Sequence, residues 1–150
     1  MKVYFDNAAS TKILPASAEK MVEVLTDYYA NPGASSVMGM EADNILKDSA
    51  KILARLINCT ENEIYFTSGG TEGDNWAIFG TAEGYIRSGK HMVTTAIEHP
   101  AVSKPFAALE EKGWEVTYLP VDEKGYVSTE DIKNAVREDT VLVSIILINN

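Results

Sequence analysis

A glycine turn flanked by hydroxyl residues is the stretch of this sequence whose residue types best suit an anion site. Ser68 and Thr71 stand on either side of Gly69 and Gly70, just after residues 64–67. Because glycine lacks a β-carbon, the backbone there can turn sharply and approach a ligand closely. The helical pattern that begins near Thr71 would add free N–H groups, for which phosphate is the usual occupant. A plain capped helix after a tight turn has the same pattern, so the turn alone leaves both interpretations open.

Two further polar clusters end apolar segments of the chain. Residues 98–100 (Glu-His-Pro) close the segment that begins with 91–96, and residues 149–150 (Asn-Asn) follow the apolar run 141–148. His99 carries an imidazole, which titrates near neutrality and suits proton transfer. Alternatively, the histidine could only cap or hydrogen-bond the backbone of the turn before Pro100, without a chemical role. The residues alone leave that alternative open.

Apolar periodicity predicts the elements that must position these clusters. Helical spacing predicts helices at 13–29, 39–57, 71–88, 101–112 and 129–137, and strand patterns predict strands at 63–67, 91–96, 114–119 and 141–148. Pro105 leaves a turn followed by a helix from Ser103 as an alternative for the fourth helix. Alternation of strands and helices predicts the α/β class, with a parallel sheet and flanking helices. Ligands of such sheets gather at the carboxyl ends of the strands, so we expect a site where the three polar clusters meet.

Apolar stripes on the expected helices indicate which faces are buried. The stripes are Leu14, Ala18, Met21, Val22, Leu25, Tyr28 and Tyr29, then Ala42, Ile45, Leu46, Ala50, Leu53, Leu56 and Ile57, then Trp76, Phe79, Ala82 and Ile86, and last Val102, Phe106 and Leu109. The run 141–148 is typical of a strand buried on both faces. No helix is expected after it, so the chain is expected to be part of a larger sheet.

Composition and charge narrow the class of protein. A chain of 150 residues suits one domain, and 45% of them are hydrophobic and 23% charged. The 13 Lys and Arg against 22 Asp and Glu give a net charge of −9, with no basic cluster. We therefore expect no nucleic-acid partner and no membrane partner. No apolar run approaches the ~20 residues that span a bilayer, and the start is too polar for a signal peptide.

The single cysteine indicates a reducing compartment. Cys59 cannot form a disulfide within the chain, which favours a cytoplasmic protein. No histidine or second cysteine lies near it in the sequence, so nothing there would lower its pKa or share a metal ion with it. We predict a structural thiol at Cys59 and no metal site.

A set of motifs in a fixed order identifies a family that the chain resembles. The motifs are residues 4–11, 31–32, 39, 66–72, 89–91, 95–102, 116–122 and 139–144, the last leading to 149–150. Together they resemble the cysteine desulfurases, pyridoxal-phosphate enzymes of the aminotransferase class V superfamily with fold type I. The resemblance covers the whole chain. One departure is Gly73-Asp74-Asn75, where the family commonly has Ser-Asn-Asn.

The resemblance implies roles for particular residues. Gly70 and Thr71 would hold the cofactor phosphate through backbone N–H and hydroxyl groups. His99 would lie against the pyridine ring and assist proton transfer at the substrate. Asn150 would hydrogen-bond the phenolic oxygen of the ring or the substrate carboxylate. Part of the substrate loop would come from the start of the chain, at Asn7 and the alanine after it.

The second residue of that substrate loop is Ala8, and the substrate implied by the resemblance is L-cysteine. The enzyme would convert it to L-alanine and transfer the sulfur as an enzyme persulfide for Fe–S cluster or thio-cofactor assembly. A sulfur-acceptor or scaffold protein and a homodimer are implied as well. Residues 1–150 would be the N-terminal part of the pyridoxal-phosphate-binding large domain. The Schiff-base lysine, the nucleophilic cysteine and the small domain come later in the family, so residues 1–150 alone are expected to be inactive.

Three other functions remain open at this point. Another class V enzyme, such as a selenocysteine lyase or an aminotransferase, would share the fold and the phosphate site. A truncated, non-catalytic binding module is the alternative from a different class. A dinucleotide-binding unit fits least, because the turn is not Gly-x-Gly-x-x-Gly and follows two helices.

Overall fold

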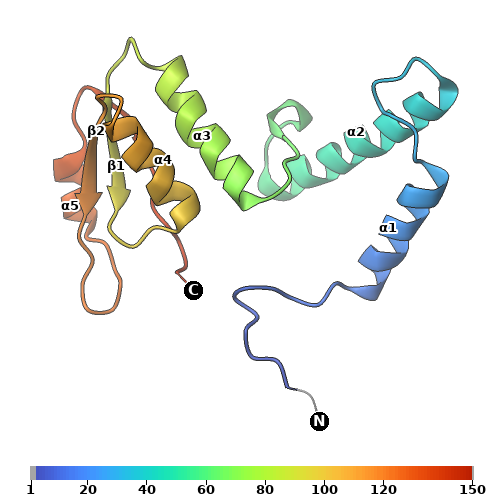
Figure 1. Ribbon diagram of the computed structural model, residues 1–150, viewed down its shortest axis with the longest axis horizontal. Helices are drawn as coiled ribbons and strands as arrows, with labels where there is room; N and C mark the ends of the chain where they lie inside the picture. The colour runs from blue at the N-terminus through green and yellow to red at the C-terminus, as the bar shows by residue number, and fades with distance from the viewer. Residues whose placement is uncertain (1–2, 150) are drawn as a thin grey trace. The chain divides into compact units, whose positions relative to one another are not determined.

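The computed structural model describes residues 3–149, and the chain divides into two compact units at the junction between Phe66 and Thr67. Figure 1 shows the order of the elements along the chain. No helix within residues 3–149 combines the length and the apolar run that a bilayer crossing requires.

The first unit consists of α1 (Pro15–Asp27), α2 (Val37–Ile57) and the short 3₁₀ helix η1 (Glu61–Glu63). Ser36 caps α2, because its hydroxyl oxygen accepts a hydrogen bond from the N–H of Gly39 at 3.1 Å. A β-carbon at Gly39 would lie 2.4 Å from the carbonyl oxygen of Ala34. The loop before α2 therefore lies against its first turn, which only glycine allows.

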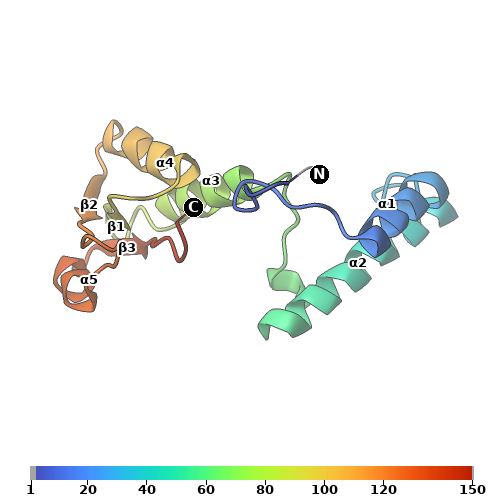
Figure 2. The same cartoon turned by 90° about the horizontal axis from the view of Figure 1, so that it is seen from below.

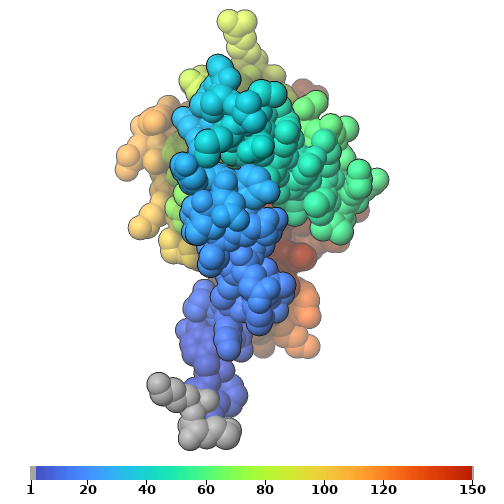
Figure 3. Space-filling model, turned by 90° about the vertical axis from the view of Figure 1, so that its right-hand side faces the viewer, coloured from blue at the N-terminus to red at the C-terminus, as the bar shows by residue number. Residues whose placement is uncertain are grey.

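The apolar stripes predicted on these two helices are mostly exposed in the first unit. α1 has no buried residue, and α2 buries only Gly39, Ala42, Ala50 and Ala54. Leu25 is 70% exposed and Leu56 is 76% exposed. Figure 3 shows the atoms of α1 and α2, in blue and turquoise, at the surface. Two helices and a loop bury too little area to cover both stripes, so only the small side chains of α2 lose their exposure.

The strand predicted at 63–67 is wrong. Glu61–Glu63 form η1, and Ile64 to Thr67 have no regular structure. The Glu63 carboxylate accepts from both the N–H and the hydroxyl of Thr60, at 2.8 Å each, which holds this turn closed. A strand also needs a neighbouring strand to accept and donate its backbone hydrogen bonds. No sheet neighbour pairs with 64–67 among the described residues.

The second unit is a three-stranded parallel sheet with helices on both faces, which confirms the α/β class. Its elements are α3 (Gly70–Gly84), β1 (His91–Thr95), α4 (Pro100–Glu110), β2 (Glu115–Leu119), α5 (Thr129–Ala135) and β3 (Thr140–Val143). The strand order is β2-β1-β3 with all pairs parallel. α3 and α4 lie together on one face, and Figure 2 shows α5 on the other.

The ends of α3 and β3 differ clearly from the sequence expectation, and the alternative that Pro105 left open for α4 is decided. α3 ends at Gly84 rather than near Ser88, and α4 is one continuous helix with Pro105 inside it. β3 ends at Val143, whereas the apolar run predicted a strand as far as 148. The N–H of Ile146 donates to the Glu98 carboxylate at 2.8 Å, so the chain leaves the ladder after β3.

One apolar cluster between the sheet and the helix pair forms the core of the second unit. Its buried members are Ile78, Ala82, Met92, Val102, Phe106, Leu109 and Trp114. The buried face predicted for α4 is confirmed. The face predicted for α3 is only partly right, because Ala82 is buried whereas Trp76 is 58% exposed and Ile86 50% exposed. The buried Ile78 was not in the predicted stripe. Contact with Met92 and Phe106, rather than the helix's own pattern, selects the face of α3 that is buried.

Candidate functional site

The turn before α3 leaves its glycine backbone open to an incoming group. Gly69 is the N-cap of α3, and a β-carbon built on Gly69 or Gly70 would meet no atom within 4 Å. The φ of Gly69 is 162°, an extended conformation that other residues also adopt. The two glycines therefore provide space above the start of the helix, rather than the sharp turn expected from the sequence. The N–H groups of Gly70 and Thr71 lie in the first turn, where a helix offers them no acceptor.

A carboxylate shares this helix start. Glu72 accepts a hydrogen bond from the N–H of Ser68 at 2.6 Å. This bond, together with the Ser68 hydroxyl, lowers the pKa of Glu72 from its ordinary value. Glu72 thus holds the turn in place and accepts the N–H of Ser68 as its hydrogen-bond donor. An open groove of about 590 Å³ starts at Ser68 and Thr71 and runs along α3 past Trp76.

His99 caps the neighbouring helix. Its Nδ1 accepts a hydrogen bond from the N–H of Ala101 at 3.0 Å, and its carbonyl accepts from Val102 and Ser103. His99 therefore does hydrogen-bond the backbone of its own turn, which is the structural alternative that the sequence left open. Because Nδ1 is an acceptor, the proton of the neutral imidazole is on Nε2. The side chain is exposed, and no described residue hydrogen-bonds its Nε2.

The loop that carries His99 is tied to the segment after β3. One oxygen of the Glu98 carboxylate accepts from the Thr95 hydroxyl at 2.7 Å and from the Ile146 N–H at 2.8 Å. The side-chain amide of Asn149 donates to the carbonyl of Ile97 at 2.7 Å. The ends of β1 and β3 thus converge, as expected for the carboxyl edge of a parallel sheet.

The structure brings together three of the six predicted site residues, Gly70, Thr71 and His99. Asn75 on α3 donates through its side-chain amide to the carbonyl of Thr71 at 2.7 Å and to that of Ala101 at 3.2 Å. The start of α3 and the start of α4 are therefore adjacent, which brings Gly70 and Thr71 near the loop of His99. The predicted role of Asn150 lies outside the described residues.

The predicted substrate loop belongs to the first unit. Asn7 and Ala8 occupy an exposed turn in which the N–H of Ala9 donates to the carbonyl of Asp6 at 3.2 Å. Their role in substrate binding stays a prediction.

Two residues of this edge had no assigned role in the sequence. In the sequence, Glu98 stands out only as the neighbour of His99, and Asn75 only as part of a departure from the family pattern. The signal that could have pointed to Asn75 is the proline inside α4. It removes the backbone donor for the carbonyl four residues earlier, and Asn75 is the side chain that supplies a donor instead.

Cys59 behaves as a structural thiol. It is half-buried, and its thiol donates to the carbonyl of Thr60 at 3.5 Å. Burial, and then the charge of Glu63, raise the pKa of this thiol. The reactive thiolate is therefore disfavoured, as predicted. No group of three His, Cys, Asp or Glu side chains within residues 3–149 is arranged to hold a metal ion.

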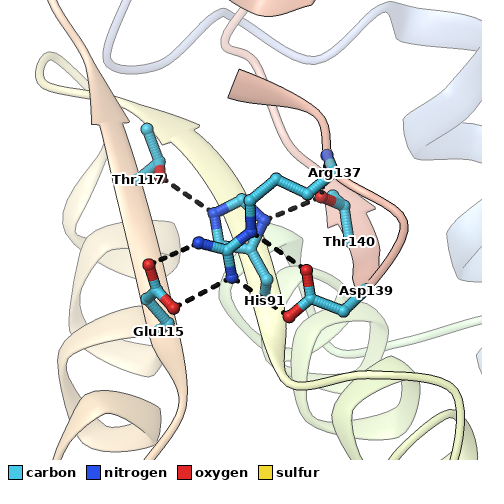
Figure 4. Close-up of polar contacts among 6 residues, drawn as sticks. All are labelled: His91, Glu115, Thr117, Arg137, Asp139 and Thr140. Atoms are coloured by element: carbon cyan, nitrogen blue, oxygen red, sulfur yellow. Dashed lines mark hydrogen bonds and ion pairs between the residues drawn. The ribbon is translucent and has the colours of Figure 1, made fainter. Parts of the chain in front are cut away.

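The second histidine of the chain lies at the opposite end of the strands, where β1 begins. His91 begins β1 and is fully buried, with Nδ1 2.7 Å from the Thr140 hydroxyl and Nε2 2.8 Å from the Thr117 hydroxyl. Beside it, Arg137 makes two hydrogen bonds to Glu115 and two to Asp139 (Figure 4). Burial, and then the positive charge of Arg137, lower the pKa of His91. Both ring nitrogens are engaged, so this cluster is structural.

Comparison with known families and curated proteins agrees with these features. Residues 3–150 match the aminotransferase class-V family. The chain is 45% identical over 148 residues to the cysteine desulfurase IscS of Methanosarcina thermophila, and 42% identical over 149 residues to the cysteine desulfurase IscS of Clostridium botulinum strain Hall. Each match covers 99% of the chain but only 37% and 38% of the relative. The chain thus spans well under half the length of these relatives.

Solved structures of similar proteins have the same fold. A NifS-like protein superposes with a TM-score of 0.95 at 38% identity, over 99% of this chain and 41% of its own. A structure of SspA in complex with cysteine gives a TM-score of 0.91 at 35% identity, over 97% of this chain and 42% of its own.

Proposed function

The chain belongs to the aminotransferase class-V family, and from this membership we propose that its protein is a cysteine desulfurase. Residues 1–150 would form the N-terminal part of its cofactor-binding large domain. The whole protein would convert L-cysteine to L-alanine and retain the sulfur as a persulfide. The relatives named cysteine desulfurase and the structure of SspA in complex with cysteine support this substrate. One geometric observation carries the proposal. The open backbone of Gly69 and Gly70 at the start of α3 lies beside the start of α4, which His99 caps.

The residues at the start of α3 fit the phosphate of pyridoxal phosphate. The space where β-carbons of Gly69 and Gly70 would stand is open, so a phosphate can approach the backbone. The N–H groups of Gly70 and Thr71 and the Thr71 hydroxyl would hold it, with support from the helix dipole. The cofactor, when bound, supplies a ring that accepts electrons from bonds breaking at the substrate.

His99 would act at its Nε2 atom. The cap bond from Ala101 keeps the neutral ring protonated at Nε2, so this nitrogen can donate a hydrogen bond toward a group above α4. Accepting a proton at Nε2 would first require the ring to move its proton to Nδ1 and release the cap. Proton transfer by His99 and the conformation of the start of α4 are therefore coupled.

The remaining parts of the reaction need residues outside this chain. The carbon–sulfur bond of L-cysteine breaks, a proton is added at the carbon, and the sulfur bonds to a thiolate of the enzyme as a persulfide. Cys59 does not fit that thiolate, because burial favours its protonated form. Asn7, Ala8 and Asn150 would contribute to the substrate and ring contacts. A homodimer, a cytoplasmic location and a sulfur-acceptor protein belong to the same proposal and rest on the resemblance to the family.

The test is an assay of the full-length protein supplied with pyridoxal phosphate, L-cysteine and a dithiol reductant. We expect L-alanine and sulfide in equal amounts, with both products lost when the cofactor is removed. Residues 1–150 alone serve as a control that should form neither product. No alanine from a cofactor-loaded protein would contradict the proposal.

The same assay distinguishes the alternatives. A strong preference for L-selenocysteine would identify a selenocysteine lyase, and amino transfer to a 2-oxo acid would identify an aminotransferase. A full-length protein that fails to bind pyridoxal phosphate would point to a non-catalytic binding module.

A further inference from the structure

Ala101, in the first turn of α4, has both of its backbone polar groups held by side chains. Its N–H donates to Nδ1 of His99 at 3.0 Å, and its carbonyl accepts from the side-chain amide of Asn75 at 3.2 Å. The residue is only 6% exposed, so water has little access to either group. A buried carbonyl without a donor is costly, which makes the bond from Asn75 significant.

Pro105 explains why that carbonyl needs an external donor. In an α-helix the carbonyl of residue 101 would accept from the N–H of residue 105, and proline has none. α4 nevertheless runs unbroken from Pro100 to Glu110. The amide of Asn75, which comes from another helix, supplies the donor that Pro105 removes.

Asn75 also holds the start of its own helix. Its amide nitrogen donates to the carbonyl of Thr71 at 2.7 Å, four residues earlier on α3. A primary amide has two N–H groups, so one side chain can serve both carbonyls at once. A continuous series of contacts therefore runs from Thr71 through Asn75 and Ala101 to the ring of His99.

We propose that Asn75 is a positioning residue that fixes the spacing between the phosphate end of the site, at Thr71, and the ring end, at His99. This inference rests on the proposed function, since it assigns these two ends to one cofactor. Asn75 contacts neither end of the cofactor itself. Its effect passes through the carbonyls of Thr71 and Ala101. Pro105 makes the bond to Ala101 necessary for stability, whereas the positioning itself comes from the link between the two helices.

A double-mutant cycle in the full-length protein tests this role. The variants are Asn75→Ala, Pro105→Ala and the two combined, because alanine at 105 restores an N–H for the Ala101 carbonyl. Asn134→Ala is the matched control, since Asn134 is an exposed asparagine on α5 and gains the same helix propensity. Two quantities are measured: the denaturation midpoint of the apo-protein and the Kd for pyridoxal phosphate.

We expect Asn75→Ala to lower the denaturation midpoint and to weaken pyridoxal-phosphate binding by about tenfold. In the combined variant the midpoint should recover toward that of Pro105→Ala, whereas the Kd should stay weakened. The near-ultraviolet circular dichroism of the bound cofactor, which reports the orientation of its ring, should remain altered too. Asn134→Ala should change none of these.

Recovery of cofactor affinity together with stability would overturn the inference, because Asn75 would then only satisfy a carbonyl. An affinity for Asn75→Ala equal to that of the unmodified protein would overturn it as well. Failure of the proposed function looks different: the unmodified protein itself would not bind pyridoxal phosphate, and the stability cycle would still report on the Pro105 bond.

Discussion

The two histidines of this chain stand at opposite edges of one sheet and have opposite environments. His91, at the amino end of β1, is fully buried and both of its ring nitrogens contact threonine hydroxyls. His99, beyond the carboxyl end of the same strand, is exposed and uses only Nδ1, to cap α4. A ring with both nitrogens engaged is fixed in place, whereas a ring held at one nitrogen is oriented and still able to act. The two histidines are only eight residues apart in the sequence. Their positions at the amino and carboxyl ends of β1 therefore decide the difference between their environments.

The largest expected effect is on activity at the carboxyl edge. His99→Ala should lower the turnover of the full-length enzyme by about 10²–10⁴-fold, the range for loss of a proton-transfer group. It should also remove the cap of α4, at a cost of about 1 kcal/mol. His99→Asn is the matched control, because asparagine caps helices well but does not titrate. Steady-state kinetics and denaturant unfolding of both variants check this. Activity that returns with the cap would make His99 a structural residue like His91.

The next effect is on stability at the amino edge. His91→Leu should lower the unfolding free energy by about 2–4 kcal/mol, because the half-buried hydroxyls of Thr117 and Thr140 lose their contacts with the buried ring. Cofactor affinity should not change. Substitution of the exposed neighbour Lys90 by methionine should have little effect on either quantity. Denaturant unfolding and cofactor titration measure the two; a loss of affinity in His91→Leu at unchanged stability would contradict the contrast.

The pH dependence of stability should also report on His91. Its pKa in the folded protein is lowered from the ordinary 6.5 by burial and by Arg137. The unfolded chain therefore binds this proton at a higher pH than the native protein does, and stability falls as the pH drops below about 6.5. The carboxylates of Glu115 and Asp139, whose pKa values are lowered by Arg137, lose their contribution only at more acidic pH. Thermal unfolding between pH 7.5 and 5.5 should show a slope that His91→Leu lacks.

The smallest expected effect comes from a buried hydroxyl between the two edges. Thr94 on β1 is fully buried, and its hydroxyl has no hydrogen-bond partner among the described residues. Thr94→Val keeps the shape and removes the unpaired group, so we expect a neutral change or a gain of up to about 1 kcal/mol. Denaturant unfolding checks this. A clear loss of stability would mean that the hydroxyl has a partner in the whole protein.

Local signals in the sequence identified most of the carboxyl edge. The turn 68–71 and the cluster 98–100 were placed correctly because they end or begin elements, and capping and turn chemistry are local. The strand predicted at 63–67 failed for the opposite reason. Its residues suit a strand, but pairing depends on a neighbour that the local pattern does not specify.

The sequence by itself determined the α/β class, the polar clusters at the starts of α3 and α4 and the family resemblance, because periodicity and turn residues act over a few positions. Only the tertiary structure decided that Asn75 reaches the Ala101 carbonyl that Pro105 leaves without a donor. It also decided the burial of His91 between the hydroxyls of Thr117 and Thr140. These features depend on contacts between residues that are 26 to 49 positions apart. Hydrogen-bond geometry and burial at such distances arise from packing, and no local pattern encodes them.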